Sequence, residues 1–169
     1  TVTDQSNCQQ FATFIVEQPD VLNDSSNVVS ATCGTTNGSI TVFPYGGTAA
    51  YTYVWNNGST SQTLIGAASG NYTVTITDAN LCTRSSQYFV NNIAGPSLAI
   101  NSTTDVNCAG DSTGSIFVTA SGGTFPYTYL WSDGSTSEDN TAIPAGLYTV
   151  TVTDNFGCTS SLTSQISEP

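Results

Sequence analysis

Apolar and polar residues alternate strictly in two stretches of the chain. In residues 148–153, YTVTVT, the tyrosine and both valines fall on one face of an extended strand and the three threonines on the other. Residues 72–77, YTVTIT, repeat this pattern. Such alternation is typical of a strand half-buried in an antiparallel sandwich. Because no sustained 3.6-residue periodicity occurs elsewhere, the sequence predicts an all-β fold.

Both stretches belong to a longer internal repeat. Residues 38–82 align with residues 114–158 without a gap, and about half of the aligned positions are identical. Three equivalent cysteines, Cys8, Cys82 and Cys158, stand 74 and 76 residues apart. Repetition at this spacing predicts tandem units of about 75 residues, each a small antiparallel β-sandwich.

Turn residues divide each unit into short strands. Glycine-containing turns at equivalent places separate the strands, and a proline-containing segment closes each unit, because proline cannot donate to a sheet ladder. We therefore expect residues 1–19 to be the last two strands of a truncated preceding repeat. Residues 20–96 and 97–169 are expected to be whole units.

Aromatic residues mark the expected core of each unit. In residues 127–131, YTYLW, the three aromatics share a face, which predicts Trp131, and Trp55 in the earlier copy, as central core residues. A buried tryptophan in the third strand and a tyrosine opening the penultimate strand are typical of immunoglobulin-like sandwiches. Tyr72 and Tyr148 would be the tyrosines whose hydroxyls bond the backbone at a corner. An exposed aromatic row would instead favour carbohydrate binding.

Charge narrows the range of functions. Twelve acidic residues face one basic residue, Arg84, and the net charge is −11. Nucleic acid and anionic lipid are therefore not expected partners, since both need clustered Lys and Arg.

No apolar run reaches the roughly 18 residues of a membrane span. With no His or Lys to activate a nucleophile, we predict no enzyme and no catalytic residues. Because the sequence contains no Met, we expect it to be a piece of a longer polypeptide.

The cysteines allow two disulfide patterns. Pairs within units would be Cys33–Cys82 and Cys108–Cys158, whereas pairs across unit boundaries would be Cys8–Cys33 and Cys82–Cys108. If six strands alternate in direction, the first and last turns of a unit meet at one end, which favours the pairs within units. Each bridge would then add roughly 4 kcal/mol to a unit and indicate an oxidising, extracellular compartment.

Three aspartates, Asp4, Asp78 and Asp154, end the equivalent Thr-rich strands. Their expected role is to accept backbone N–H groups in the following turn. The alternative is calcium binding between units. Because no EF-hand spacing and no close Cys or His cluster are present, we predict no metal or cofactor site.

The later copy resembles a known repeat over nearly its whole length. The similarity rests on the motifs GSI at 114–116, GG at 122–123, PYTYLWSDG at 126–134, GLYTVTVTD at 146–154 and GC at 157–158, together with Cys108. They are similar to the SprB repeat. The earlier copy departs from the pattern at turns, with Ala49-Ala50 for Phe-Pro, and keeps it in the core.

This resemblance implies a very large cell-surface adhesin of gliding Bacteroidetes, exported by type IX secretion. The chain would be an extracellular, disulfide-stapled spacer or adhesive element. Its partners would be neighbouring repeats of the same protein, and surface polysaccharide or other copies in a filament. The alternative is a fibre or sheath subunit that assembles by strand addition through residues 1–19.

Overall fold

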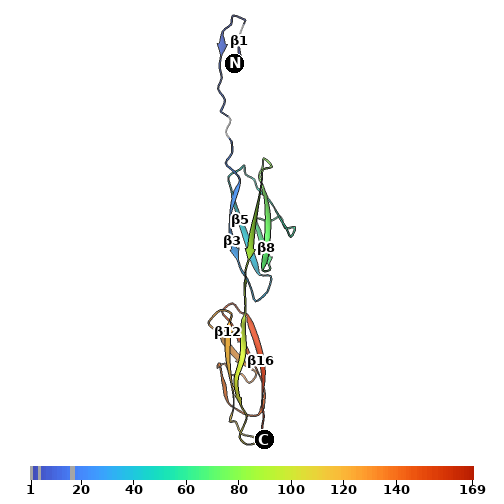
Figure 1. Ribbon diagram of the computed structural model, residues 1–169, viewed down its shortest axis with the longest axis vertical. Coiled ribbons are helices and arrows are strands. Elements are labelled where there is room, and N and C mark those ends of the chain that lie inside the picture. The colour runs from blue at the N-terminus through green and yellow to red at the C-terminus, as the bar shows by residue number, and fades with distance from the viewer. Residues whose placement is uncertain (1, 4, 16–17) are drawn as a thin grey trace.

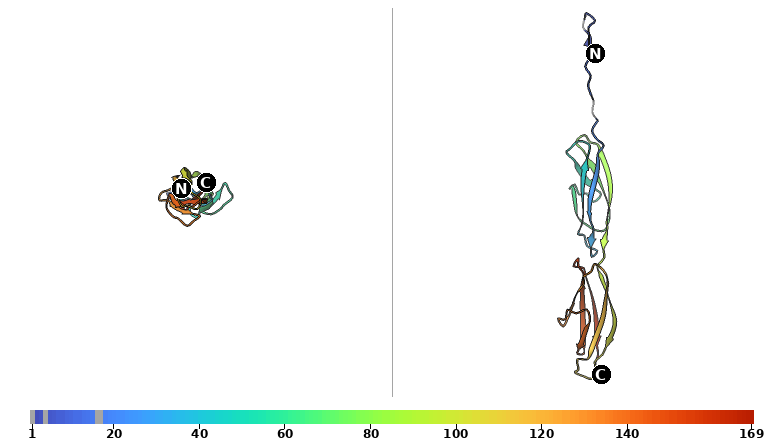
Figure 2. Two further views of the ribbon diagram at one scale, coloured as in Figure 1. Left: turned by 90° about the horizontal axis from the view of Figure 1, so that it is seen from below. Right: turned by 90° about the vertical axis from the view of Figure 1, so that its left-hand side faces the viewer.

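The computed structural model describes residues 2–3, 5–15 and 18–169, and these residues form strands and no helix (Figure 1). Two sandwiches stack end to end into a rod, and the N-terminal segment extends beyond the first of them. Viewed along the long axis, the two sandwiches overlap (Figure 2). The prediction of an all-β fold built from antiparallel sandwiches is confirmed.

Each sandwich packs one three-stranded sheet against another. In the first unit the sheets have the orders β3-β5-β7 and β6-β8-β9. Their strands are β3 (Asn23–Val29), β5 (Gly38–Tyr45), β7 (Thr63–Ala67), β6 (Thr52–Trp55), β8 (Gly70–Thr77) and β9 (Thr83–Val90). The second unit repeats this arrangement with β11-β12-β14 and β13-β15-β16. These strands are β11 (Pro96–Thr104), β12 (Gly114–Gly122), β14 (Asn140–Ile143), β13 (Thr128–Trp131), β15 (Gly146–Thr153) and β16 (Thr159–Ile166).

The chain crosses between the two sheets in the middle of each unit. In the first unit, β7 runs antiparallel to β5 and β6 runs antiparallel to β8. The loop that joins β5 to β6 lies at the end where β8 finishes, since the Thr48 N–H reaches the Asp78 carboxylate there. Consecutive strands β6 and β7 therefore run in the same direction, away from Asp78, and the strict alternation of direction is broken between them.

Each unit has its own hydrophobic core with a tryptophan in it. Trp55 and Trp131 are each 2% exposed. Their indole N–H groups donate to the Ser61 carbonyl at 2.8 Å and the Ser137 carbonyl at 2.9 Å. The inward valines and isoleucines of the alternating strands, such as Val74 and Ile76, are fully buried, as the period of two requires.

Both tyrosines of the alternating strands bond the backbone of the preceding turn. Tyr72 is partly buried and its hydroxyl donates to the Ala68 carbonyl at 3.2 Å. Tyr148 is buried and donates to the Pro144 carbonyl at 2.9 Å. These are corner bonds of the immunoglobulin-like type, which fix the entry into β8 and β15.

A polar network joins the two sheets of the first unit. The Asp24 side chain, 1% exposed, accepts hydrogen bonds from the Ser86 hydroxyl at 2.6 Å and from the Tyr88 hydroxyl. Arg84 forms an ion pair with the same carboxylate at 3.4 Å. In the second unit, Leu98 stands at the position of Asp24 and Leu162 at the position of Ser86, and both leucines pack against the core. At equivalent positions between the two sheets, the first unit thus has polar contacts and the second has apolar packing.

The N-terminal segment contains a two-stranded hairpin of β1 (Val2–Thr3) and β2 (Gln9–Gln10). Val2 pairs with Gln10 in it, as Ile76 pairs with Arg84 at the end of the β8-β9 hairpin. This register is consistent with a truncated repeat over residues 1–19, and the assignment stays a prediction.

Candidate functional site

A disulfide joins the two units. Cys33 of the first unit is bonded to Cys158 of the second, with Cα atoms 5.4 Å apart and a sequence separation of 125. The predicted pairs Cys33–Cys82 and Cys108–Cys158 are therefore wrong, and so is the alternative that paired Cys33 with Cys8. Cys82 and Cys108 are exposed and form no disulfide.

The course of the strands explains why a pair within one unit is impossible. Because β6 and β7 run in the same direction, β8 begins at the Cys33 end of the unit and finishes at the other end, where Cys82 follows. The eight residues of β8 span about 26 Å at roughly 3.3 Å per residue. A disulfide needs Cα atoms closer than about 7 Å. Cys33 instead faces the next unit, whose β15-β16 turn presents Cys158.

The linker between the units is held by backbone hydrogen bonds. Its short strand β10 (Asn92–Ile93) pairs in parallel with β4 (Ala31–Thr32), which follows β3 in the first unit. The Ala31 N–H donates to the Asn91 carbonyl at 2.8 Å, and the Cys33 N–H donates to the Ile93 carbonyl at 2.9 Å. The residue that carries the disulfide is thus fixed to the linker by its own N–H.

Gly95 lets the linker pass close to the bonded cysteine. A Cβ atom added at Gly95 would lie 2.9 Å from the Cys158 Cβ, closer than side chains ordinarily approach. Cys158 is 2% exposed. The junction therefore brings together three segments, the loop with Cys33, the linker, and the turn with Cys158, in van der Waals contact.

Asp154 builds the turn that presents Cys158. Its Oδ1 accepts the N–H groups of Phe156 and Cys158, both at 2.9 Å, and its Oδ2 accepts the Thr124 N–H at 2.9 Å. Burial raises the pKa of Asp154, but the N–H donors of Thr124, Cys158 and Phe156 outweigh it, and the net pKa is lowered. The carboxylate is therefore held in its charged form as a turn-building group.

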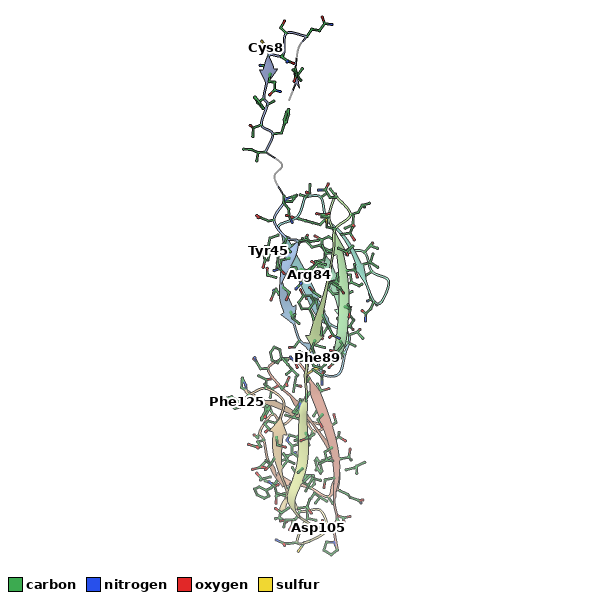
Figure 3. The ribbon with its side chains drawn as sticks, turned by 45° about the horizontal axis from the view of Figure 1, so that its top comes forward. Cys8, Tyr45, Arg84, Phe89, Asp105 and Phe125 are labelled. Carbon is green, nitrogen blue, oxygen red and sulfur yellow. A yellow bond between two sulfur atoms is a disulfide. The ribbon has the colours of Figure 1, made fainter. Side chains whose placement is uncertain are left out.

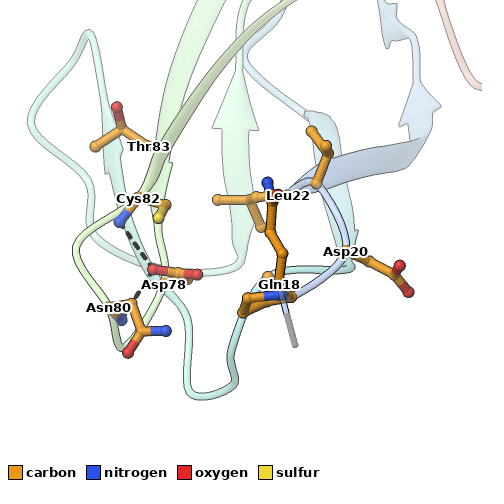
Figure 4. Close-up of a pocket in the computed structure, with 10 residues that line it drawn as sticks. Gln18, Asp20, Leu22, Asp78, Asn80, Cys82 and Thr83 are labelled. Atoms are coloured by element: carbon orange, nitrogen blue, oxygen red, sulfur yellow. Dashed lines mark hydrogen bonds between the residues drawn. The ribbon is translucent and has the colours of Figure 1, made fainter. Parts of the chain in front are cut away.

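Asp78 makes the same bonds in the first unit. Its Oδ2 accepts the Thr48 N–H at 2.9 Å, and its Oδ1 accepts the N–H groups of Asn80 at 2.9 Å and Cys82 at 2.8 Å (Figure 4). The Thr48 donor contributes most to lowering the pKa of Asp78, against the opposing effect of burial. Asp4, the third equivalent residue, lies outside the described residues.

The other proposed chemistries find no assembled site. No group of three or more acidic, His or Cys residues gathers in the described ranges 2–3, 5–15 and 18–169. Because Trp55 and Trp131 are buried, neither can stack on a sugar. The junction is the place where side chains from distant parts of the sequence meet, and the sequence reasoning missed it. A glycine beside the linker proline was its only local signal.

No curated protein sequence is similar enough to count as a match. Among the described residues, no helix has the length and apolar character needed to cross a membrane.

Several solved structures, among them structures of immunoglobulin domains, are similar to the chain at low identity. The N-terminal eight Ig domains of Down Syndrome Cell Adhesion Molecule (DSCAM) isoform 1.30.30 share 15% identity, with 85% of this chain and 27% of that chain covered and a TM-score of 0.48. Immunoglobulin domains 1–4 of Sidekick-1 share 10% identity, with 91% of this chain and 50% of that chain covered and a TM-score of 0.40. Extracellular domains 3–5 of Drosophila OTK share 13% identity, with 86% of this chain and 62% of that chain covered and a TM-score of 0.37. The chain spans less than two thirds of each of these structures.

The family comparison matches both units. The matched segments begin in the first strand of each unit and end shortly after its core tryptophan, and they include Cys33 and Cys108. The resemblance drawn from the sequence is confirmed: residues 25–60 and 100–136 match the SprB repeat.

Proposed function

We propose that the chain is a stiff spacer segment of a large bacterial surface adhesin, exported by type IX secretion and serving in attachment or gliding. The SprB repeat and the immunoglobulin-like architecture suggest an extracellular, adhesin-like repeat module. Repeats of this kind are typically not enzymes. The finer role rests on how the junction carries load.

The course of the chain through the junction is the observation that supports a spacer. Starting from residue 20, β3 runs the length of the first unit to Cys33, the disulfide crosses to Cys158, and β16 runs the length of the second unit. This line consists of two strands that are already extended and one covalent bond. Tension applied at the two ends passes along it without breaking a sheet hydrogen bond. We call this course the load line.

The composition of the surface agrees with a spacer. Exposed faces are rich in Ser, Thr and Asn, and the net charge of −11 favours solubility and self-repulsion between neighbouring rods. Weak contacts to polysaccharide or to other filament copies would come from many repeats at once.

The alternative, strand addition through residues 1–19, is less well supported. Gln9 and Gln10 pair with Thr3 and Val2 of the same chain, so these edges are already used in the described hairpin. A subunit that donates residues 9–10 through the strand edge that β1 occupies would have to open this hairpin first. Mixing isotopically labelled and unlabelled chains and searching for intermolecular contacts of residues 9–10 tests this alternative.

A cell-based exchange separates spacer from adhesive. The coding segment for residues 20–169 is deleted in frame from the parent gene, or replaced by two unrelated immunoglobulin-like units of the same length. For a spacer, attachment falls on deletion and returns with the replacement, and excess purified chain does not compete with cells for the surface. Competition by the purified chain, or failure of the replacement, would show that these units themselves bind.

A further inference from the structure

We propose that Cys82 and Cys108 are half-built junctions, each of which forms a disulfide with a neighbouring copy of this repeat. The bond would join the cysteine equivalent to Cys33 in one unit to the cysteine equivalent to Cys158 in the next. The inference concerns the assembly of the array and holds whether or not the chain acts as a spacer.

The far end of the second unit repeats the linker side of the observed junction. The Val106 N–H donates to the Ser167 carbonyl at 3.1 Å, as the Ala31 N–H does to Asn91. The Gly110 N–H donates to Glu168 Oε2 at 3.2 Å. In the first unit a nearby donor, the Gly34 N–H directly after Cys33, reaches the Asn92 side chain at 2.9 Å.

The Ser167 carbonyl and the Glu168 side chain thus lie beside residues 106–110, as Asn91 and Asn92 lie beside residues 31–34. The Ser167 N–H also donates to Asp105 Oδ1 at 2.8 Å, and Asp105 lies at the end of the second sandwich remote from the first (Figure 3). Cys108 is therefore presented beside an outgoing linker, as Cys33 is, and it is exposed.

The near end of the first unit repeats the other side of the junction. Cys82 stands in a turn built by Asp78 with the same three backbone donors that Asp154 uses around Cys158. Cys158 is 2% exposed because the first unit covers it, whereas Cys82 is exposed. Cys82 borders a hollow of about 320 Å³ that residues 18–22, Gly47 and Asp78 also line (Figure 4).

The incoming chain passes this hollow in the register of the observed linker. A Cβ atom added at Gly47 would lie 2.7 Å from Asp78 Oδ2 and 3.3 Å from the Leu22 Cβ. In the second unit, Gly123 approaches Asp154 and Pro96 in the same way, so Leu22 corresponds to Pro96 and Val21 to Gly95. Because Val21 replaces a glycine, the linker must lie slightly farther from Cys82 than Gly95 lies from Cys158.

The partner that we propose for Cys82, and likewise for Cys108, is another unit of the same kind. The observed disulfide shows that the Cys33 end of one unit fits the Cys158 end of the unit that follows it. Bond formation removes one hydrogen from each of two thiols. The electron pair and two protons pass to the disulfide of a thiol–disulfide oxidoreductase, which leaves as a dithiol.

A head-to-tail chain tests the proposal directly. Residues 20–169 are joined to the C-terminus of the full 169-residue chain, so that Asp20 follows Pro169. This connection places Leu22 of the second copy three residues after Pro169, as Pro96 stands three residues after Ile93. The protein is oxidised with a disulfide oxidoreductase, the thiols are alkylated, and the monomer is mapped under non-reducing conditions.

We expect a Cys82–Cys108 peptide beside the Cys33–Cys158 peptide, and half of all Cys82 and half of all Cys108 protected from alkylation. Within one copy these two cysteines lie at opposite ends of the rod, so their bond reports the new junction. Cys108→Ser in the first copy should abolish the linked peptide, and Cys108→Ser in the second copy should leave it unchanged. A folded monomer with both Cys33–Cys158 bonds formed, but with all Cys82 and Cys108 alkylated, would overturn the proposal.

Discussion

Pulling the chain by its two ends should reveal how much of it the junction disulfide protects from force. The sulfurs of Cys33 and Cys158 bridge 125 sequence positions. An extended chain spans at most about 3.3–3.6 Å per residue, so roughly 410–450 Å of chain lies inside the bridge and cannot lengthen. We therefore expect the fully stretched oxidised chain to be shorter than the reduced chain by this amount.

Little else is left to extend in the oxidised chain. Residues 20–33 and 158–169 carry the load line and are already extended along the rod. The remaining length comes from the N-terminal segment. Because force bypasses β5 to β9 and β11 to β15, neither core should unfold until the disulfide is reduced.

Single-molecule force spectroscopy measures these lengths. Handles are attached at both termini, and the same molecules are stretched before and after a reductant is added. The Cys33→Ser variant should behave as the reduced chain does, and Cys108→Ser, which removes an exposed and unbonded thiol, should behave as the oxidised one. The reasoning fails if reduction releases no length. It also fails if reduction releases about 330–360 Å, the length expected from bridges that each close about 50 residues within a unit.

Three further substitutions test the units themselves. Trp131→Ala should cost the second unit about 3–5 kcal/mol in urea unfolding, whereas Leu130→Ala, on the exposed face of the same strand, should change stability by no more than about 0.5 kcal/mol. Equal effects of the two would contradict the assigned core. Asp24→Ala should destabilise the first unit by about 1–3 kcal/mol, since it leaves the partly buried hydroxyls of Ser86 and Tyr88 without this acceptor. Unchanged unfolding of the first unit would show that water replaces the carboxylate. Asp154 has a pKa below its unfolded value, so its charged form stabilises the second unit above about pH 4, and this stabilisation is lost as pH falls through the lower folded pKa. Asp154→Asn should remove part of the acid dependence of the melting temperature, and an identical pH profile would refute this role.

Local patterns in the sequence were sufficient to predict the strands and the cores. The alternation in residues 72–77 and 148–153 fixes which side chains point inward, and it does so without reference to the rest of the fold. The repeat then transfers each assignment from one unit to the other. For this reason Trp55 and Trp131 occupy equivalent buried positions.

Such local patterns could not predict the pairing of the cysteines. The partners in the disulfide depend on the direction of β7, a five-residue strand that the chain enters by crossing between sheets instead of reversing. Nothing in the sequence of residues 56–62 distinguishes a crossing from a hairpin, because both use the same turn residues. One reversed strand moves Cys82 to the opposite end of the unit and changes every pairing. The β4-β10 pairing, two residues on each side, is likewise too short to leave a pattern.

Because the disulfide joins the units, it carries tension between them and leaves the stability of each core to that core's own packing. A bridge inside a unit would stabilise that unit's core and leave the linker to carry tension between units. With the bond at the junction, each core depends on its own buried side chains, about ten in the first unit and eight in the second. The bond itself removes the linker and both cores from the path of the force. An array built in this way keeps its length under load even when an individual unit is only marginally stable, because unfolding a unit adds almost nothing to the end-to-end distance.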